Sequence, residues 1–583
     1  MNSALLALIG FAAFFFGYRF YSRRIGATIY RSNPAVPTPA HEMEDGLDYV
    51  PTRRHILFGH HFTSIAGAAP IIGPSVAAYW GWLPAFLWVV LGTVFMGAVH
   101  DFGALVVSVR EKGRSIADIA SDVMRGRART MFLIFVLMLI WLVLAVFAMA
   151  IADLFVVVPA SVLPINVEII LAIAMGWMLY KKRAKSLIPS LTALGLLYFF
   201  VWLGPRFPLS LENLGLTREA STNTWVLLLF LYSGVASLLP VWFLLQPRDY
   251  INSHQLFVGL ALLYLGIFVA RPVLDAPAIR TAADPSAPPL FPLLFVTIAC
   301  GAISGFHGLV ASGTTSTQIN RMKDARFIGY GGMVGEGVLA LASTIAAVAG
   351  IALIASSDLP SVGHVEDLSW SVYYDNWAHA SANKAAAFVL GGGALIEHLG
   401  IGHRFATTLM AVLVISFAAT TLDTATRIQR FVLTELGSAL NFKPLTNRYT
   451  ATAVALAPAV LLAMWNVPDP SGGGVKQAGW ILWPVFGASN QMLAALTLMV
   501  LTLYFWARGR SVLPVLIPMV FIMIVTLVSL VLKARDFYLS DRVLFVINGV
   551  LIILILWMIR EGLAAVFRLR QSAKQTGEEI GYR

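Results

Sequence analysis

Apolar stretches long enough to cross a lipid bilayer recur along the whole chain, and they constrain its fold more than any other feature. Crossing the hydrocarbon core takes about 20 helical residues, and hydropathy gives about 15 such segments. Of the 583 residues, 58% are hydrophobic and 12% are charged, whereas a soluble domain carries about 25% charged residues. We therefore predict an all-α polytopic membrane protein. The predicted spans are 3–21, 56–79, 84–109, 130–158, 164–180, 187–203, 222–245, 253–270, 289–315, 327–355, 405–426, 449–466, 479–506, 512–532 and 543–559.

The basic residues predict the orientation of these spans. Roughly three quarters of the 41 Lys and Arg residues fall on one side when the spans alternate across the membrane. That side is expected to be cytoplasmic, which places the N-terminus in the periplasm and the C-terminus in the cytoplasm. The net charge of +11 is thereby explained by topology, with no need for nucleic acid. The apolar stretch 384–401 would invert the later loops if it spanned, so we predict a re-entrant or outer-surface segment hinged at Gly391–Gly393.

The same reading divides the chain into parts. Residues 1–30 are predicted to form a peripheral transmembrane helix, and residues 50–466 a transporter core with broken helices. Residues 467–570 are predicted to add accessory transmembrane helices, and residues 571–583 a cytoplasmic tail.

The segment 55–74 carries the clearest polar interruption of a span. It contains His61 and Ser64, followed by Gly67, Ala68 and Pro70. A helix must break there, and broken backbone in a membrane is tolerated only where it is buried in protein or lines a cavity. Freed amides can hold a carboxylate and freed carbonyls a cation, so these five residues are predicted to bind substrate. The alternative is that the histidines cap the cytoplasmic end of the helix.

A second small- and proline-rich segment suggests an internal repeat. Residues 222–245 carry Ser233, Gly234, Ser237 and Pro240, so they resemble the interruption at 56–79. Paired interrupted spans indicate an inverted-repeat transporter with its site at the repeat interface, although Gly and Pro are common in membrane helices.

Ionisable residues inside the apolar segments are costly and call for a reason. His100 and Asp101 lie well inside their span and are predicted to form a proton relay, the alternative being an Asp that pairs with a structural Arg or caps a helix. Glu336 is a lone carboxylate in an apolar segment and a candidate proton carrier. Asp423 and Arg427 are four residues apart, so one helix face can pair them, either as a gate or as a structural salt bridge.

Residues 300–318 offer a row of hydroxyls and one histidine. Ser304 and His307 are predicted to bind substrate, and Ser312, Thr314 and Thr315 to bind a coupling ion. The alternative is ordinary helix packing through small residues. No Walker motif or zinc-protease motif occurs in the sequence, the single cysteine is Cys300, and the histidines at 55, 60 and 61 lack a convincing set of metal ligands. We therefore expect neither an enzyme nor a bound metal or organic cofactor.

Six sequence blocks in a fixed order resemble one known family. They are HHFTSIAGAAPIIGP (60–74), VHDFGAL (99–105), REKGRSIADIA (110–120), CGAISGFHGLVASGTTSTQ (300–318), TTLDTATRIQRF (420–431) and FGASNQMLAALTL (486–498). Together they resemble the carbon starvation protein A family of bacterial inner-membrane transporters. The chain departs from the pattern at Ala69, where a glycine is expected, and at Gly308, where a hydroxyl residue is expected.

The resemblance implies a function and a core architecture. It implies secondary active import of peptides or pyruvate across the bacterial inner membrane when carbon is scarce, coupled to protons, on a LeuT-type inverted-repeat core. The expected partners are the lipid bilayer and a small-molecule or peptide substrate, with H⁺ or Na⁺ as the coupling ion. The sequence does not determine the oligomeric state. The alternatives are a transporter-like nutrient sensor, a channel, or a sodium-coupled transporter of another small carboxylate.

Overall fold

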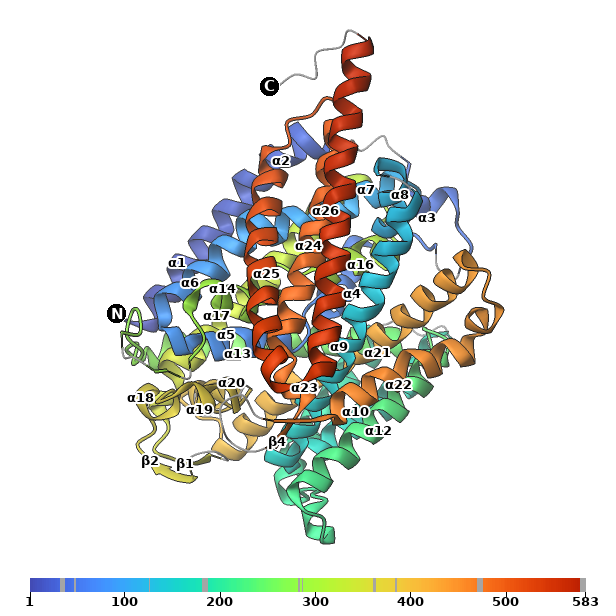
Figure 1. The fold of residues 1–583 in the computed structure, drawn as a ribbon. Coiled ribbons are helices and arrows are strands. Elements are labelled where there is room, and N and C mark those ends of the chain that lie inside the picture. Colours follow the sequence, from blue (N-terminus) through green and yellow to red (C-terminus); the bar gives the residue numbers. More distant parts are fainter. Residues whose placement is uncertain are drawn as a thin grey trace.

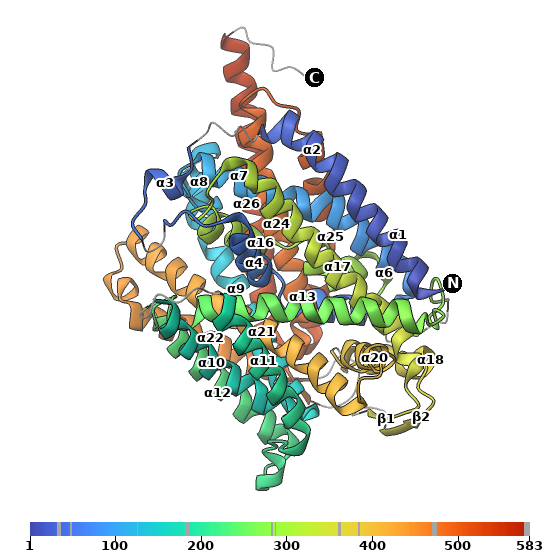
Figure 2. The same ribbon diagram turned by 180° about the vertical axis from the view of Figure 1, so that it is seen from behind.

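The apolar stretches fold into long helices, which Figures 1 and 2 show from two opposite sides. The computed structural model describes residues 1–31, 37–46, 49–124, 126–180, 187–281, 284–285, 287–359, 363–382, 385–468 and 475–576. Within these residues, 12 helices are long and apolar enough to cross a membrane, or up to 13 if the bent pair Arg54–Ile65 and Ala69–Trp80 counts as one span. The chain is therefore an all-helical, multi-pass membrane protein.

The helices of the first half of the chain are α1 (Ser3–Phe16), α2 (Ser22–Ile25), α3 (Pro39–Glu42), α4 (Arg54–Ile65), α5 (Ala69–Ala77), α6 (Trp82–Gly92), α7 (Ala98–Arg110), α8 (Ile116–Val123), α9 (Gly126–Val157), α10 (Val162–Tyr180), α11 (Leu187–Leu203), α12 (Arg218–Leu238) and α13 (Leu245–Ala270). Those of the second half are α14 (Leu290–Thr297), α15 (Ala299–Ala302), α16 (Gly305–Val310), α17 (Gly331–Ile345), α18 (Trp370–Tyr373), α19 (Trp377–Ala382), α20 (Ala386–Glu397), α21 (His403–Ala439), α22 (Arg448–Met464), α23 (Ala478–Ile481), α24 (Trp483–Trp506), α25 (Leu513–Ser540) and α26 (Arg542–Thr576). Five-residue π-helical segments extend several of them: η1 (Gly17–Tyr21), η2 (Gly26–Tyr30), η4 (Thr93–Gly97), η8 (Ala311–Thr315), η10 (Arg326–Tyr330) and η11 (Ala346–Gly350).

Two short antiparallel hairpins accompany the helices. Strand β1 (Ser356–Leu359) pairs with β2 (Gly363–Glu366), and β3 (Asn466–Pro468) pairs with β4 (Val475–Gln477). Figures 1 and 2 place the β1–β2 hairpin at the opposite end of the molecule from α8 and the end of α26.

The first predicted helix break is confirmed. Helices α4 and α5 bend by 50° across residues 66–68. A Cβ at Gly67 would lie 2.6 Å from the Thr421 hydroxyl oxygen and 3.1 Å from the Phe147 ring, so only a glycine lets the chain approach α21 and α9 this closely. Pro70 lies in the first turn of α5, where a missing N–H costs no hydrogen bond.

The second interruption lies elsewhere than predicted. Helix α12 runs unbroken through Ser233, Gly234 and Ser237 and ends before Pro240, so the pairing of 56–79 with 222–245 as two broken spans is wrong. The small residues serve packing instead, since a Cβ at Gly234 would lie 2.8 Å from a Leu456 methyl of α22.

The second broken span is residues 290–315. It forms α14, α15, α16 and η8, with extended backbone at Ile303 and Ser304. The two broken spans touch, because a Cβ at Gly73 of α5 would lie 2.5 Å from the Thr297 carbonyl oxygen.

The stretch 384–401 forms the 12-residue helix α20, which is shorter than the 18 residues required of the candidate spans. Lys384 lies outside the described residues. The predicted hinge at Gly391–Gly393 is wrong, since these glycines lie within α20. They allow close packing, because a Cβ at Gly391 would lie 2.3 Å from the Ala346 carbonyl oxygen and one at Gly392 would lie 2.6 Å from the Met410 methyl.

Several predictions of organisation stay predictions. Three predicted spans are not among the 12: the segment 56–79, which forms the bent pair, the broken segment 289–315, and the segment 449–466, which forms the 17-residue helix α22. The total of about 15 spans, the LeuT-type core, the sides of the termini and the division at residue 466 remain to be tested. Helix α26 continues to Thr576, and residues 577–583 of the expected tail lie outside the described residues.

Candidate functional site

Four of the predicted residues form one continuous cluster in the interior of the bundle. The Nδ1–H of His100 donates to Asp101 Oδ1 at 2.7 Å, and the Nδ1–H of His307 donates to Asp101 Oδ2 at 2.9 Å. His307 Nε2 lies 3.1 Å from Glu336 Oε2. All four side chains have 0% exposure. We call His100, Asp101, His307 and Glu336 the central cluster.

Glycines and a helix break bring the three helices of the central cluster together. A Cβ at Gly97, just before α7, would lie 2.4 Å from the Ala302 carbonyl oxygen at the second break. A Cβ at Gly329 would lie 2.9 Å from Phe102 Cα, so the segment leading into α17 also packs directly on α7. These close contacts place His307 of α16 between the carboxylates of α7 and α17.

The contact between His307 and Glu336 is an ion-pair contact and not a well-formed hydrogen bond. Their atoms are 3.1 Å apart, yet neither Glu336 oxygen has a hydrogen-bond partner of good geometry among the described residues. His100 Nε2 also lacks such a partner. Unsatisfied buried polar atoms are rare in folded proteins, and these atoms of the central cluster are free to bind a proton. His307, predicted to bind substrate, thus lies among the predicted proton carriers.

His61 lies next to the central cluster without a direct hydrogen bond to it. Its Nδ1 forms a hydrogen bond of 2.8 Å with the Thr315 hydroxyl. Its Nε2 faces α17, where a Cβ at Gly332 would lie 3.5 Å away, one helical turn before Glu336. His61 and Thr315 were predicted for different roles, and the structure pairs them.

Of the other two hydroxyl residues predicted to bind an ion, Ser312 already has protein partners and Thr314 is only half-buried. Ser312 Oγ donates to the Gly308 carbonyl at 2.7 Å and accepts the Ile116 N–H at 3.3 Å. Thr314 is half-buried, and its carbonyl accepts the Thr317 hydroxyl at 2.9 Å.

Ser304 takes part in the capping of the second break. It forms hydrogen bonds with the Asn490 side chain of α24, at 2.9 Å from Nδ2 and 3.3 Å from Oδ1. The same Asn490 oxygen accepts the N–H of Phe306, in the first turn of α16, at 3.0 Å. At the first break, Ser64 Oγ donates to the His60 carbonyl at 2.8 Å, and Gly67, Ala68 and Pro70 are buried.

A second buried cluster of charges lies between α10, α12, α13 and α21. Arg248 donates from Nε to Glu168 Oε1 at 2.9 Å and from Nη1 to Asp423 Oδ2 at 2.8 Å. The Tyr232 hydroxyl donates to the same Asp423 oxygen at 2.9 Å, and Ser416 Oγ donates to Glu168 Oε2 at 2.6 Å. We call Arg248, Glu168, Asp423, Tyr232 and Ser416 the arginine cluster.

The partner predicted for Asp423 has to be corrected. Asp423 pairs with Arg248 of α13, 175 positions earlier in the chain, and the predicted partner Arg427 has its Nη1 3.4 Å from the Leu239 carbonyl and its guanidinium over the Phe431 ring. The spacing of four residues allowed the local pair, but tertiary packing supplied an arginine from another helix.

Sequence reasoning missed Arg248 and Glu168 for identifiable reasons. Arg248 falls between the predicted spans 222–245 and 253–270, whereas it lies in the first turn of α13 with 1% exposure. Glu168, assigned no role, is a lone carboxylate in an apolar segment, which was the available signal. Next to Arg248, Asp249 pairs with His60 of α4 at 3.1 Å, where the His60 side chain is 18% exposed.

Comparison with known proteins identifies the family. The model of the carbon starvation protein CstA family matches residues 2–529. The chain belongs to this family. A peptide transporter CstA of Mycobacterium tuberculosis is 33% identical over 88% of this chain and 72% of its own length. The pyruvate/proton symporter BtsT of Escherichia coli is 33% identical over 91% of this chain and 82% of its own length.

Among solved structures, a manganese transporter mutant of Eremococcus coleocola aligns over 91% of this CstA-family chain and 99% of its own, with 13% identity and a TM-score of 0.46. Because a TM-score below 0.5 does not establish a common core, the LeuT-type architecture stays a prediction.

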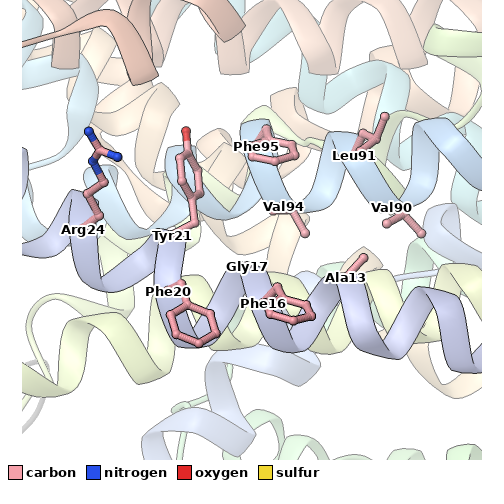
Figure 3. Close-up of a pocket in the computed structure, with 10 residues that line it drawn as sticks. All are labelled: Ala13, Phe16, Gly17, Phe20, Tyr21, Arg24, Val90, Leu91, Val94 and Phe95. Atoms are coloured by element: carbon pink, nitrogen blue, oxygen red, sulfur yellow. The ribbon is translucent and has the colours of Figure 1, made fainter.

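A groove on this CstA-family chain lies apart from both clusters. It has a volume of about 400 Å³ and lies between the N-terminal helix and the segment Val90–Phe95. Its lining, shown in Figure 3, is apolar along most of its length, with Tyr21 and Arg24 at one end. No residue of the central or arginine cluster lines it, so it is not the predicted substrate site.

Proposed function

We propose that this CstA-family chain is a secondary active transporter that imports a peptide or pyruvate together with protons across the bacterial inner membrane. The relatives named for these substrates are similar over most of their length, since 72% and 82% of the M. tuberculosis and E. coli proteins are matched. The one with a named coupling ion is a pyruvate/proton symporter. We infer the same class of chemistry for this chain, as a carrier and not as an enzyme.

The central cluster is the observation that carries the proposal. It holds two carboxylates and two imidazoles in contact, with 0% exposure; His100, Asp101 and Glu336 lie in candidate membrane spans and His307 in the broken segment packed against them. Ionisable groups in a membrane are expensive and mark proton relays in transporters. Imidazoles exchange protons near neutral pH, and both oxygens of Glu336 lack well-formed hydrogen bonds within the described structure. The central cluster therefore suits the uptake and release of a proton.

The broken helices support a transport cycle around this cluster. His307 follows the second break by three residues, and His61 precedes the first by five. Discontinuous helices occur in transporters where a substrate or ion binds near the bilayer midplane. A proton taken up by His307 or Glu336 changes the charge next to the second break, and we infer that this change couples protonation to access.

Sodium coupling at Ser312 and Thr315 is the less favoured alternative. The Ser312 hydroxyl donates to Gly308 and accepts from Ile116, and the Thr315 hydroxyl bonds to His61. Because Ser312 Oγ already accepts one N–H, it has one lone pair left for a sodium ion, so we prefer the proton.

The experiment is uptake of labelled pyruvate and of a labelled dipeptide into proteoliposomes, with and without an inward proton gradient and at fixed pH with and without sodium. We expect the proton gradient to drive accumulation of at least one substrate. In Glu336→Gln we expect gradient-driven accumulation to be lost and exchange of internal for external substrate to persist, because the carrier still binds substrate but holds one titratable group fewer.

Glu397→Gln is the matched control, because Glu397 is an exposed carboxylate paired with His403 at 3.0 Å. It should accumulate substrate as the wild type does. Uncoupled, non-saturating flux would indicate a channel. Failure of the wild type to accumulate either substrate with protons or sodium would contradict the proposed function.

A further inference from the structure

The arginine cluster carries an unbalanced charge. Arg248 is 1% exposed, and its two partners Glu168 and Asp423 are 0% exposed. One guanidinium cannot neutralise two carboxylates, so the cluster has a net charge of −1 when both are ionised. Such a charge is costly inside a membrane-spanning bundle, and a proton on one carboxylate removes it.

The hydrogen bonds indicate which carboxylate has room for that proton. Glu168 uses both oxygens, one for Arg248 at 2.9 Å and one for Ser416 at 2.6 Å. Asp423 accepts from Arg248 and Tyr232 on the same oxygen, Oδ2. Its other oxygen, Oδ1, is buried without a partner among the described residues. Of the two carboxylates, Asp423 is therefore the one with an oxygen free to take up a proton.

Arg248 itself has an unused donor, and further unpaired polar atoms follow along α13. Its Nη2 is buried with no hydrogen-bond partner in the described part of the chain, as are Asn252 Oδ1 and both amide atoms of Gln255. Positions 248, 252 and 255 share one helix face and extend over about 10 Å at 1.5 Å per residue. Such a row of unsatisfied buried groups is rare, and it points to a ligand with several polar atoms.

The first helix break lies next to this row. Gly67 packs on Thr421, where a Cβ would lie 2.6 Å from the hydroxyl, and Thr421 precedes Asp423 by two residues. The neighbouring Thr420 accepts the Asn252 amide at 2.8 Å. A substrate beside the break therefore lies within a few residues of the buried, unpaired atoms Arg248 Nη2 and Asp423 Oδ1.

We propose that Arg248 binds the carboxylate of the transported molecule and that it does so by releasing the carboxylate of Asp423. This inference rests on the proposed function and names the substrate site that the proposed function needs. Arginine presents a planar fork that matches a carboxylate in two hydrogen bonds. Asp423 occupies one arm of that fork while the site is empty and competes with the incoming carboxylate.

The exchange keeps the charge of the cluster constant. A proton from water binds Asp423 Oδ1, the Asp423–Arg248 ion pair opens, and the substrate carboxylate takes its place on Nη1 and Nη2. The cluster then holds one guanidinium, one Glu168 carboxylate, one neutral Asp423 and one substrate carboxylate, which again sums to −1. Release of substrate reverses the step and returns the proton to water.

The charged and titratable groups around Asp423 are compatible with this exchange. Arg248 opposes it directly, the Tyr232 hydroxyl donates to it, and Asp249 adds a second negative charge nearby. Beyond these lie Glu168 on the far side of Arg248, His60 on the far side of Asp249, and Arg427 one turn along α21. His60, with its side chain 18% exposed, is the member of this group most open to water.

The row on α13 also defines the class of ligand. A small 2-oxo acid such as pyruvate needs only Arg248. A dipeptide with its C-terminal carboxylate on Arg248 can place a peptide bond against Asn252 and Gln255, whose side-chain amides both donate and accept. Both classes share the carboxylate, so both test the assignment.

The test compares each carboxylate with its amide. Binding of pyruvate and pyruvamide, and of dialanine and dialanine amide, is measured on the purified full-length protein for the wild type, Arg248→Gln, Arg248→Lys and Asp423→Asn. We expect Arg248→Gln to weaken carboxylate binding by about 30-fold or more and to leave amide binding unchanged. Arg248→Lys, which keeps the charge but loses the fork, should weaken it less.

The direction in which Asp423→Asn changes carboxylate affinity distinguishes a substrate site from a purely structural cluster. This substitution removes the competitor and mimics the protonated side chain, so carboxylate affinity should be equal to or higher than that of the wild type and should lose its dependence on pH. If the cluster only stabilises the fold, variants of Arg248 and Asp423 change affinity in the same direction, or not at all, and the assignment is wrong. If Arg248→Gln does not fold, Arg248→Lys and Asp423→Asn still give this comparison.

Arg430→Gln is the matched control. Like Arg248, Arg430 is a buried arginine, with 8% exposure. It lies on α21, and its Nη1 donates to the Ser237 carbonyl at 2.7 Å and not to a carboxylate. The variant should keep the wild-type preference for carboxylate over amide. A wild type that transports but does not distinguish carboxylate from amide overturns this inference alone, whereas a wild type that neither binds nor transports either substrate overturns the proposed function with it.

Discussion

Asp101 is the group on which both histidines of the central cluster converge, so its replacement tests the cluster most directly. It accepts from His100 at 2.7 Å and from His307 at 2.9 Å, and all three side chains have 0% exposure. Alanine at this position leaves two buried imidazole N–H groups without an acceptor, at about 1–3 kcal/mol each. We therefore expect Asp101→Ala to lower the free energy of unfolding by about 2–6 kcal/mol.

Asparagine separates the charge of Asp101 from its shape. The side-chain oxygen of the asparagine still accepts one imidazole N–H, but its amide N–H faces the N–H of the other imidazole, so two donors meet. That second imidazole can change tautomer, since a proton on His307 Nε2 would face Glu336 at 3.1 Å. We expect Asp101→Asn to cost about 1–3 kcal/mol, the price of one impaired buried hydrogen bond.

The lost charge should affect transport more than stability. Opposite unit charges 2.9 Å apart, the separation of His307 Nδ1 and Asp101 Oδ2, interact by about 6 kcal/mol at an effective dielectric constant near 20. A protonated His307 loses that interaction in Asp101→Asn. We therefore expect loss of proton-driven accumulation, with exchange of internal for external substrate retained.

Two measurements on the same preparations check this reasoning. Thermal unfolding in detergent should rank the wild type above Asp101→Asn and Asp101→Asn above Asp101→Ala. Uptake into proteoliposomes should show exchange but no gradient-driven accumulation for Asp101→Asn. Intact proton-driven accumulation in Asp101→Asn, or an Asp101→Ala variant as stable as the wild type, would refute the role of the central cluster.

Substitutions at Gly67, Asn490 and Gly308 test the packing that positions the site. Gly67→Ala places a Cβ 2.6 Å from a hydroxyl oxygen of α21 and should cost about 1–3 kcal/mol in thermal unfolding, whereas Gly195→Ala, with nothing within 4 Å, should be neutral or stabilising. Asn490→Ala removes the acceptor of the first-turn amide of α16 and should destabilise by about 1–3 kcal/mol without changing substrate preference. A Cβ at Gly308 would lie 3.2 Å from His100 Nε2, so Gly308→Ser should be about 1 kcal/mol more stable than Gly308→Ala by supplying a partner for that nitrogen.

The sequence indicated three members of the central cluster because a membrane leaves few reasons for a buried charge. His100, Asp101 and Glu336 each stand in an apolar segment, so their cost alone indicated a role. The break at 66–68 was predictable for a similar reason, since Gly67 and Pro70 follow polar residues within one span. What the sequence did not indicate was that His307 joins these residues, because its neighbours are small residues typical of helix packing.

The pairings between distant helices could not be predicted from a single sequence. Local spacing favoured Arg427 as the partner of Asp423, because the rule for helix faces reaches only four residues. The observed partner, Arg248, is 175 positions away and falls between two of the spans predicted from hydropathy. The second break likewise depends on Asn490 of another helix, which satisfies the backbone where the span is interrupted.

Helix α4 connects the two clusters. Adjacent residues of a helix point in different directions, so His60 reaches Asp249 of α13 at 3.1 Å and His61 reaches Thr315 of η8 at 2.8 Å. Asp249 adjoins Arg248, and Thr315 ends the broken segment that carries His307. Because α4 ends at the first break, a tilt of α4 about that break lengthens one or both contacts unless α13 or η8 moves with it. A change at the arginine cluster therefore cannot move α4 without disturbing the surroundings of the central cluster, which is the physical link that the proposed proton coupling needs.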